Sequence, residues 1–114
     1  MQYLLLLYED DAKFETMPEA EHKGLIAEYK ALMREMQDAG VFLAAGRLRQ
    51  VATATSVRVR SGNAMVTDGP FAETKEQLGG FLLIDVANLD EALAWAAKAP
   101  TARVGTVEVR PMWS

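Results

Sequence analysis

Cysteine is absent from this sequence of 114 residues, and histidine occurs once, at His22. The absence of cysteine excludes disulfide bonds, thiolate nucleophiles and thiolate zinc sites. With one histidine, only carboxylates remain as metal ligands, and they do not follow the spacing of a calcium loop. We therefore expect no metal and no cofactor. A chain without disulfides also fits the reducing cytoplasm.

Basic residues and long apolar runs are also scarce. Lys and Arg number 12 against 16 Asp and Glu, which gives a formal net charge of -4. This balance argues against nucleic acid as a partner, because binding to phosphates requires a basic face. No apolar run approaches the ~20 residues of a transmembrane helix, and the run Tyr3–Tyr8 is too short for a signal peptide. We expect a single cytoplasmic domain over residues 1–114 that does not contact a membrane.

Hydrophobic periodicity predicts the main elements. Two short runs, Gln2–Tyr8 and Gly80–Val86, are apolar on both faces, which is typical of strands covered on both sides. A long amphipathic helix is predicted from about Pro18 to Ala39, with Gly40 as its stop and an acidic loop before it at residues 9–11. The other predicted elements are a strand at 41–45, a hairpin of 56–60 and 64–68 joined by 61–63, a helix from Asn88 that stops before Pro100, and a strand at 106–110.

This order of elements predicts an α+β fold of the ferredoxin-like type, βαββαβ with an inserted β-hairpin. The first and third strands of that pattern lie in the middle of an antiparallel sheet, and here they are the two runs apolar on both faces. Two helices cover only one face of such a sheet. We therefore expect a second copy to cover the other face, which would make the protein a homodimer.

The stretch Val66–Gly80 concentrates turn-forming and charged residues between two predicted strands. Asp-Gly-Pro marks a sharp turn, and polar groups held on a loop between rigid strands are often functional. The run DGPFAETKEQLGGF resembles the signature of the DGPF-domain branch of the YCII-related family. The resemblance extends to MQYLLLLYED, ATATSVRVRSG and DEALAWAAK, and it implies a dimeric α+β barrel.

The resemblance also implies candidate functions. Some small YCII-related proteins carry a His–Asp pair proposed for acid–base chemistry, with the histidine about eleven residues before the glycine that ends the first helix. Counting back from Gly40 in this chain reaches Tyr29, so a mechanism based on histidine is not expected. DGPF-domain members resemble proteins encoded beside extracytoplasmic-function sigma factors, which implies a link to transcriptional control.

Asp68 and Tyr29 are the candidate catalytic residues. Asp68 is either a general base and pocket anchor, or a carboxylate that ties its own turn through backbone N–H groups. Tyr29 either places its hydroxyl in the pocket as a proton donor or belongs to the apolar stripe of its helix.

Arg47, Phe71, Glu73 and Lys75 are the candidate substrate-binding residues. Arg47 and Lys75 suit a carboxylate ligand, with Glu73 beside them, although a solvated charged loop is the simpler interpretation. Phe71 is expected to fill the core beneath the loop, with contact to a ligand as the alternative. His22 is expected to be exposed near the start of its helix.

Two functions follow from these residues. The first is a protein that binds a small organic ligand between the helical layer and the sheet, near Asp68 and Tyr29, with lyase- or isomerase-type proton transfer as its most concrete form. The alternative is a non-catalytic accessory protein that docks on a partner such as a sigma factor.

Overall fold

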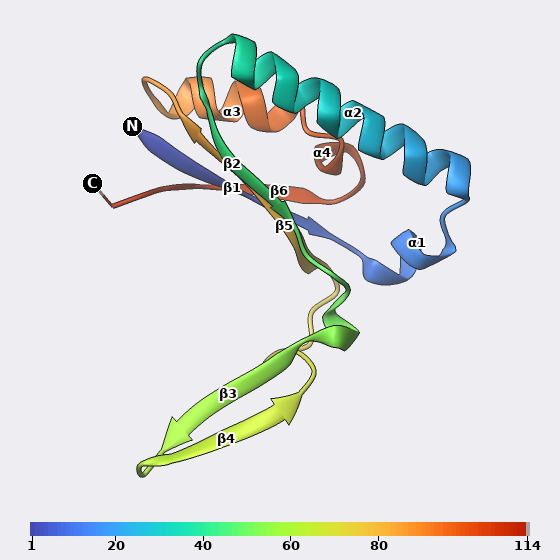
Figure 1. Ribbon diagram of the computed structural model, residues 1–114, viewed down its shortest axis with the longest axis vertical. Helices are drawn as coiled ribbons and strands as arrows, with labels where there is room; N and C mark the ends of the chain where they lie inside the picture. The colour runs from blue at the N-terminus through green and yellow to red at the C-terminus, as the bar shows by residue number, and fades with distance from the viewer. Residues whose placement is uncertain (114) are drawn as a thin grey trace.

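The computed structural model describes residues 1–113 and shows an α+β fold (Figure 1). The helices are α1 Asp11–Thr16, α2 Glu19–Asp38, α3 Leu89–Ala97 and α4 Thr101–Val104, with a short 3-10 turn, η1, at Val51–Thr53. The strands are β1 Gln2–Glu9, β2 Phe42–Arg47, β3 Thr55–Arg60, β4 Asn63–Asp68, β5 Gln77–Asp85 and β6 Thr106–Pro111. None of the helices in this range is long and apolar enough to cross a membrane.

Four strands form an antiparallel sheet in the order β2-β5-β1-β6. The two central strands, β1 and β5, are the runs that the sequence marks as apolar on both faces, so this prediction is confirmed. Leu5 of β1 lies opposite Leu82 of β5 and Val109 of β6, which fixes the register at the centre of the sheet. β6 lies at an edge, as expected of a strand that ends at Pro111.

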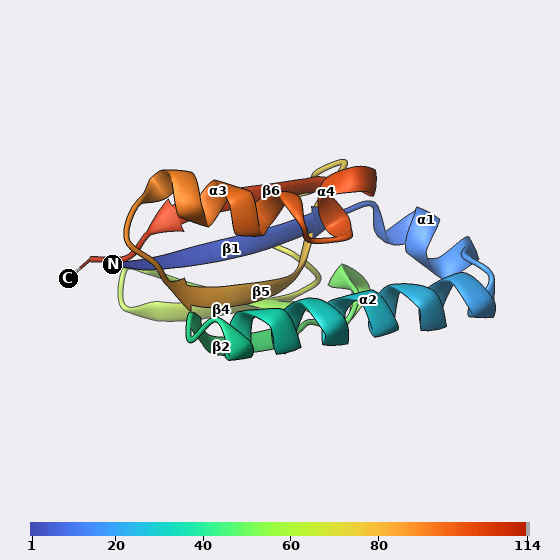
Figure 2. The ribbon, with the colours of Figure 1, turned by 90° about the horizontal axis from the view of Figure 1, so that it is seen from above.

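The long helices cover one face of this sheet (Figure 2). Side chains alternate between the faces of a strand, so every second residue of β1 meets the helices. Tyr3, Leu5 and Leu7 are buried in this way and belong to one core with residues of α2, β5 and α3. The alternate residues Leu4 and Leu6 face the other side and are only partly buried. We call that side the open face, because no helix in the described part of the chain covers it.

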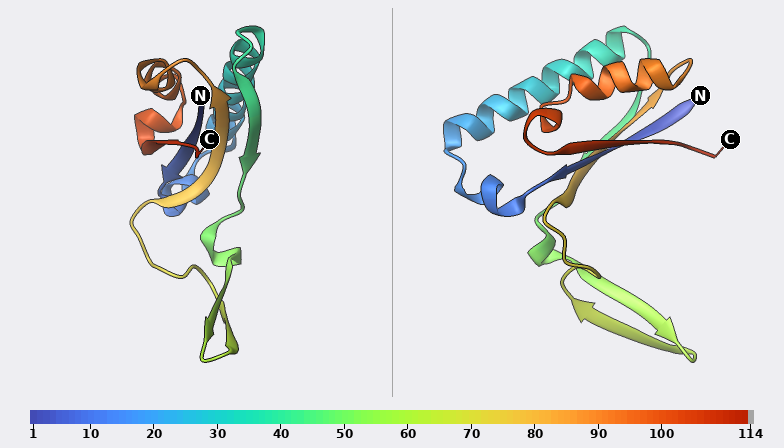
Figure 3. Two further views of the ribbon diagram at one scale, coloured as in Figure 1. Left: turned by 90° about the vertical axis from the view of Figure 1, so that its left-hand side faces the viewer. Right: turned by 180° about the vertical axis from the view of Figure 1, so that it is seen from behind.

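The strands β3 and β4 form a separate two-stranded sheet, the arm (Figure 1). It projects on the side of the main sheet that lies away from the helices (Figure 3). The predicted hairpin is confirmed, with one correction to its turn. Ser61 and Gly62 take the positive φ angles, of 53° and 80°, whereas Asn63 already pairs with Arg60. Two residues of positive φ give the tight turn that suits the twist of paired strands.

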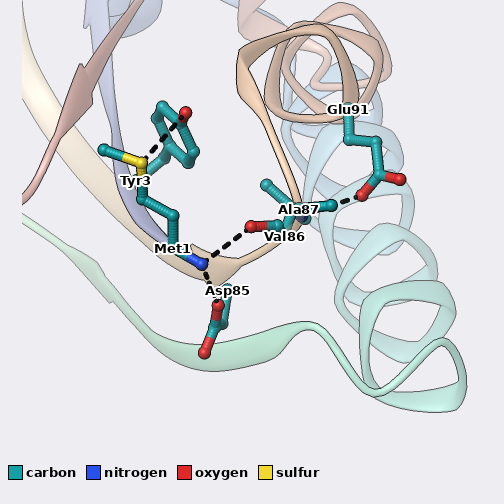
Figure 4. Close-up of polar contacts among 6 residues, drawn as sticks. All are labelled: Met1, Tyr3, Asp85, Val86, Ala87 and Glu91. Carbon is teal, nitrogen blue, oxygen red and sulfur yellow. Dashed lines mark hydrogen bonds and ion pairs between the residues drawn. The ribbon is translucent and has the colours of Figure 1, made fainter.

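The ends of β1 and β5 meet where the chain enters α3 (Figure 4). The Met1 amino group donates to Asp85 Oδ1 at 2.8 Å and to the Val86 carbonyl at 2.9 Å. Asn88 caps α3 as predicted, since its Oδ1 accepts from the Glu91 N–H at 3.0 Å. The Glu91 carboxylate accepts from the Ala87 N–H, one residue earlier than a regular capping box requires.

Three sequence-based expectations need correction. The predicted acidic loop at 9–11 is absent as such, since Glu9 ends β1, Asp11 begins α1, and Asp10 between them caps the helix by accepting from the Ala12 N–H at 3.0 Å. Helix α4 was not predicted, since one turn is too short to show a helical period. Strand β5 begins at Gln77 rather than at Gly80, so the two glycines lie within the strand.

Candidate functional site

A cavity of about 400 Å³ lies between α2 and the helix-facing side of the sheet. Pockets of this size accommodate small organic molecules. Its walls come from α1, α2 and the adjoining parts of β1, β2 and β5, and they are mostly apolar. The apolar residues include Leu7, Leu25, Ile26, Met33 and Leu82.

Small residues on β2 and β5 line the side of the cavity formed by the sheet. Ala45, Gly46, Gly79 and Gly80 are all among the lining residues. A Cβ atom at Gly80 would lie 2.7 Å from the carbonyl oxygen of Gly46, so the two strands approach closely only because residue 80 is glycine. Larger side chains at Ala45 and Gly80, which share the helix-facing side with Leu82, would reduce the space below α2.

Tyr29 lies at the cavity and forms a hydrogen-bonded chain with Thr101 and Glu9. The Tyr29 hydroxyl bonds to Thr101 Oγ1 and also accepts from the Thr101 N–H at 3.2 Å. Thr101 Oγ1 donates to Glu9 Oε1 at 3.2 Å. An ionised carboxylate only accepts, so the Thr101 hydroxyl donates its proton to Glu9 and the Tyr29 hydroxyl donates to Thr101. A path for a proton thus runs from α2 through α4 to β1.

Burial is the main influence on the Tyr29 hydroxyl. It raises the pKa of Tyr29 above its ordinary value of 10.0, and this effect outweighs the hydrogen bonds from Thr101, which lower the pKa. The negative charge of Glu9 raises the pKa further. The Tyr29 phenol is therefore protonated and uncharged at neutral pH.

Three cationic side chains, Lys30, Arg47 and Arg49, also line the cavity. Among residues 1–113, none of them takes part in an ion pair. Glu9 and Asp11 also line the cavity, where Asp11 Oδ2 accepts from the Val51 N–H at 2.9 Å and Glu9 accepts from Thr101, so three cationic side chains stand against two carboxylates. The cavity therefore offers positive charge to a ligand, although the chain as a whole is acidic.

Phe14 and His22 belong to the site and were not predicted to do so. Their ring centroids are 4.2 Å apart in an edge-to-face arrangement, and His22 Nε2 lies 2.8 Å from the Phe14 carbonyl oxygen. The Arg47 guanidinium lies 5.8 Å from the centre of the Phe14 ring. The expectation that His22 is exposed was wrong, because α1 folds against the start of α2 and half-buries it. The capping residue Asp10 was the one signal in the sequence that pointed to α1.

The structure does not bring the four signature-loop candidates to this cavity. Asp68 is exposed at the end of β4, opposite Thr55, and Glu73 and Lys75 are exposed beyond it. Phe71 is 79% exposed, so the expectation that it fills the core was wrong for a single copy of the chain. The physical reason is the arm, which carries residue 68 away from the helical layer. Only Tyr29 and Arg47 of the predicted site residues meet at the cavity.

The turn after Asp68 is stabilised by backbone groups and by Ser56, and not by the Asp68 carboxylate as expected. Gly69, with φ of 96°, donates its N–H to the Ala54 carbonyl at 2.6 Å and accepts from Ser56 Oγ at 2.8 Å. No hydrogen bond in the described range involves the Asp68 carboxylate. The interpretation that Asp68 ties its own turn is therefore not supported.

The raised pKa of Tyr29 predicts a late titration. Because the folded state keeps this proton longer than the unfolded chain, its contribution to stability is complete below about pH 10 and is lost as pH rises further. The tyrosinate ultraviolet absorbance of the unmodified protein minus that of a Tyr29→Phe variant should rise with a midpoint above about 10. A difference curve with its midpoint at or below that value would contradict the burial of this hydroxyl.

Comparison with known proteins places this arrangement in a family. The chain matches the YCII-related domain family over residues 1–114. It is 40% identical over 114 residues to an uncharacterized protein, R00369, of Rhizobium meliloti (strain 1021), in an alignment that covers 98% of this chain and 92% of that protein. A match over the whole length shows the family directly. The chain is a member of the YCII-related domain family.

Proposed function

We propose that this protein binds a small organic acid in the cavity between α2 and the sheet. The observation that carries the proposal is the combination of apolar walls with Lys30, Arg47 and Arg49, which form no ion pair within residues 1–113. Apolar surface favours the hydrocarbon part of a ligand, and a guanidinium forms two parallel hydrogen bonds with a carboxylate. The run from Asp68 to Phe81 also supports membership of the DGPF-domain branch.

Arg47 is the anchor in this proposal, because it lies against Phe14 rather than in an ion pair within the described chain. In the unmodified protein, benzoate and hexanoate at ten times their dissociation constants should raise the melting temperature by several degrees, since binding contributes about 1.4 kcal/mol. The neutral amides, benzamide and hexanamide, should have much smaller effects. In an Arg47→Gln variant the difference between acid and amide should disappear, as measured by thermal unfolding.

Arg34→Gln is the matched control, because Arg34 is an exposed residue of α2 that does not line the cavity. This variant loses the same charge and should respond to the acids as the unmodified protein does. Two results would contradict the proposal: neither acid stabilises the protein, or Arg47→Gln responds like Arg34→Gln. The first would favour the alternative of a non-catalytic accessory protein bound to a sigma factor.

Catalysis of proton transfer is the narrower form of this proposal. The hydrogen-bonded chain from Tyr29 through Thr101 to Glu9 supports it, because linked hydroxyl and carboxylate groups can relay a proton. Asp68 has no part in this version. The protein should accelerate exchange of the hydrogens next to the carbonyl group of 2-oxobutanoate with heavy water, as followed by proton NMR.

A Tyr29→Phe variant should lose most of this acceleration while still binding benzoate, because it keeps the ring and lacks the proton. General acid–base groups contribute about 10²–10⁴-fold in rate, so the loss should be easily measured. Equal exchange rates with and without the unmodified protein would restrict the function to binding.

We also propose that a second copy of the chain covers the open face. Leu4 and Leu6 of the central strand present apolar side chains there, and the helices lie on the other side (Figure 2). A sheet packed face to face on an identical sheet buries both apolar surfaces at once and closes the assembly by two-fold symmetry.

A further inference from the structure

The arm, formed by β3 and β4, is amphipathic and is exposed on both sides. In its register, Val57 lies opposite Val66 and Val59 lies opposite Ala64, so these side chains share one side of the ribbon. Val57, Val59 and Val66 are 64%, 60% and 68% exposed. The other side carries Arg58 and Arg60, although Met65, opposite Arg58, is also on that side. One side of the arm is therefore built for burial, yet nothing in the described part of a single copy buries it.

The two strands of the arm are tied to each other at its base. The backbone bond from Gly69 to Ala54 and the bond from Ser56 to the Gly69 carbonyl close the hairpin where it leaves the body. With the arm, the molecule is broad and flat, with extents of 47, 41 and 19 Å. Its radius of gyration is 16.0 Å, against about 13 Å for a compact domain of this length. An isolated two-stranded ribbon is only marginally stable in water, so the arm requires a partner.

We propose that the arm grips a second copy of the chain and packs its valine side on that copy while the open faces of the two sheets meet. The arm projects on the same side of the sheet as the open face, so a sheet seated there would lie within its reach (Figures 1 and 3). This inference rests on the two-fold pair proposed above and adds the segment that holds the pair together.

The areas support a single continuous interface. With ~3.3 Å per residue and ~4.8 Å between strands, one side of the arm covers on the order of 200 Å² and the open face on the order of 400 Å². A stable interface needs about 800 Å² of accessible surface from each partner. Neither surface reaches this value alone. The two surfaces together approach this value, because the accessible surface of protruding side chains is larger than the flat area estimated here.

The pairing also gives the signature corner a role. Asp68 and the exposed Phe71 lie at the base of the arm, so the second copy that the arm grips lies beside them. Residues that a single copy leaves in solvent would become part of the contact between copies.

The test is a double variant, Val57→Thr with Val66→Thr, compared with Val104→Thr. Threonine keeps the shape and the strand preference of valine but loses its apolar character. Val104 lies on α4, is 53% exposed and serves as the control for the same replacement outside the arm. Sedimentation velocity over a concentration series should show the dimer dissociation constant raised about tenfold or more by the double variant and unchanged by the control.

A photoreactive amino acid at position 57 provides a second measurement that does not depend on the variant's stability. In a mixture of isotopically light and heavy chains, irradiation should link one chain to the other. If the unmodified protein dimerises but the double variant has the same dissociation constant, or cross-links stay within one chain, the role of the arm is refuted and the sheet pairing survives. If the unmodified protein does not dimerise, both fail.

Discussion

The apolar character of both faces of β1 and β5 is the constraint on which the rest of the structure depends. Alternate residues of β1 enter the core under the helices, while Leu4 and Leu6 face the other way. The helix-facing side is buried within one chain. The other side is not buried, and each Å² of its apolar surface left in water costs roughly 25 cal/mol of free energy. The shape of the whole molecule, including the projecting arm, is best understood from this imbalance.

The cavity depends on the same sheet. Small residues on β2 and β5 leave space below α2, and α1 and the start of α2 close one end of it. Into this space the sequence places the cations Lys30, Arg47 and Arg49, together with the hydroxyl of Tyr29 and its hydrogen-bonded partners. The site thus joins groups that suit an organic anion with groups that suit a proton transfer, and these groups come from several different elements.

The sequence predicts the fold well because the fold rests on patterns within single segments. Two runs apolar on both faces identify the central strands, and the helical period over Leu25, Leu32 and Met36 identifies α2. The site is predicted less well because its residues meet only through tertiary packing. Thr101 lies on a helix of one turn, and Phe14 on a helix of six residues, so neither carries a period that marks its partner. Asp68 was favoured for its turn chemistry, which says nothing about the direction in which the hairpin projects.

The most direct measurement of the central claim is the mass of the unmodified protein in solution at micromolar concentration. Sedimentation equilibrium should give twice the 12.5 kDa of a single chain, because the proposed pair would bury both the open face and the arm. A stable species of 12.5 kDa would contradict the account, since the apolar side of the two central strands would then face water.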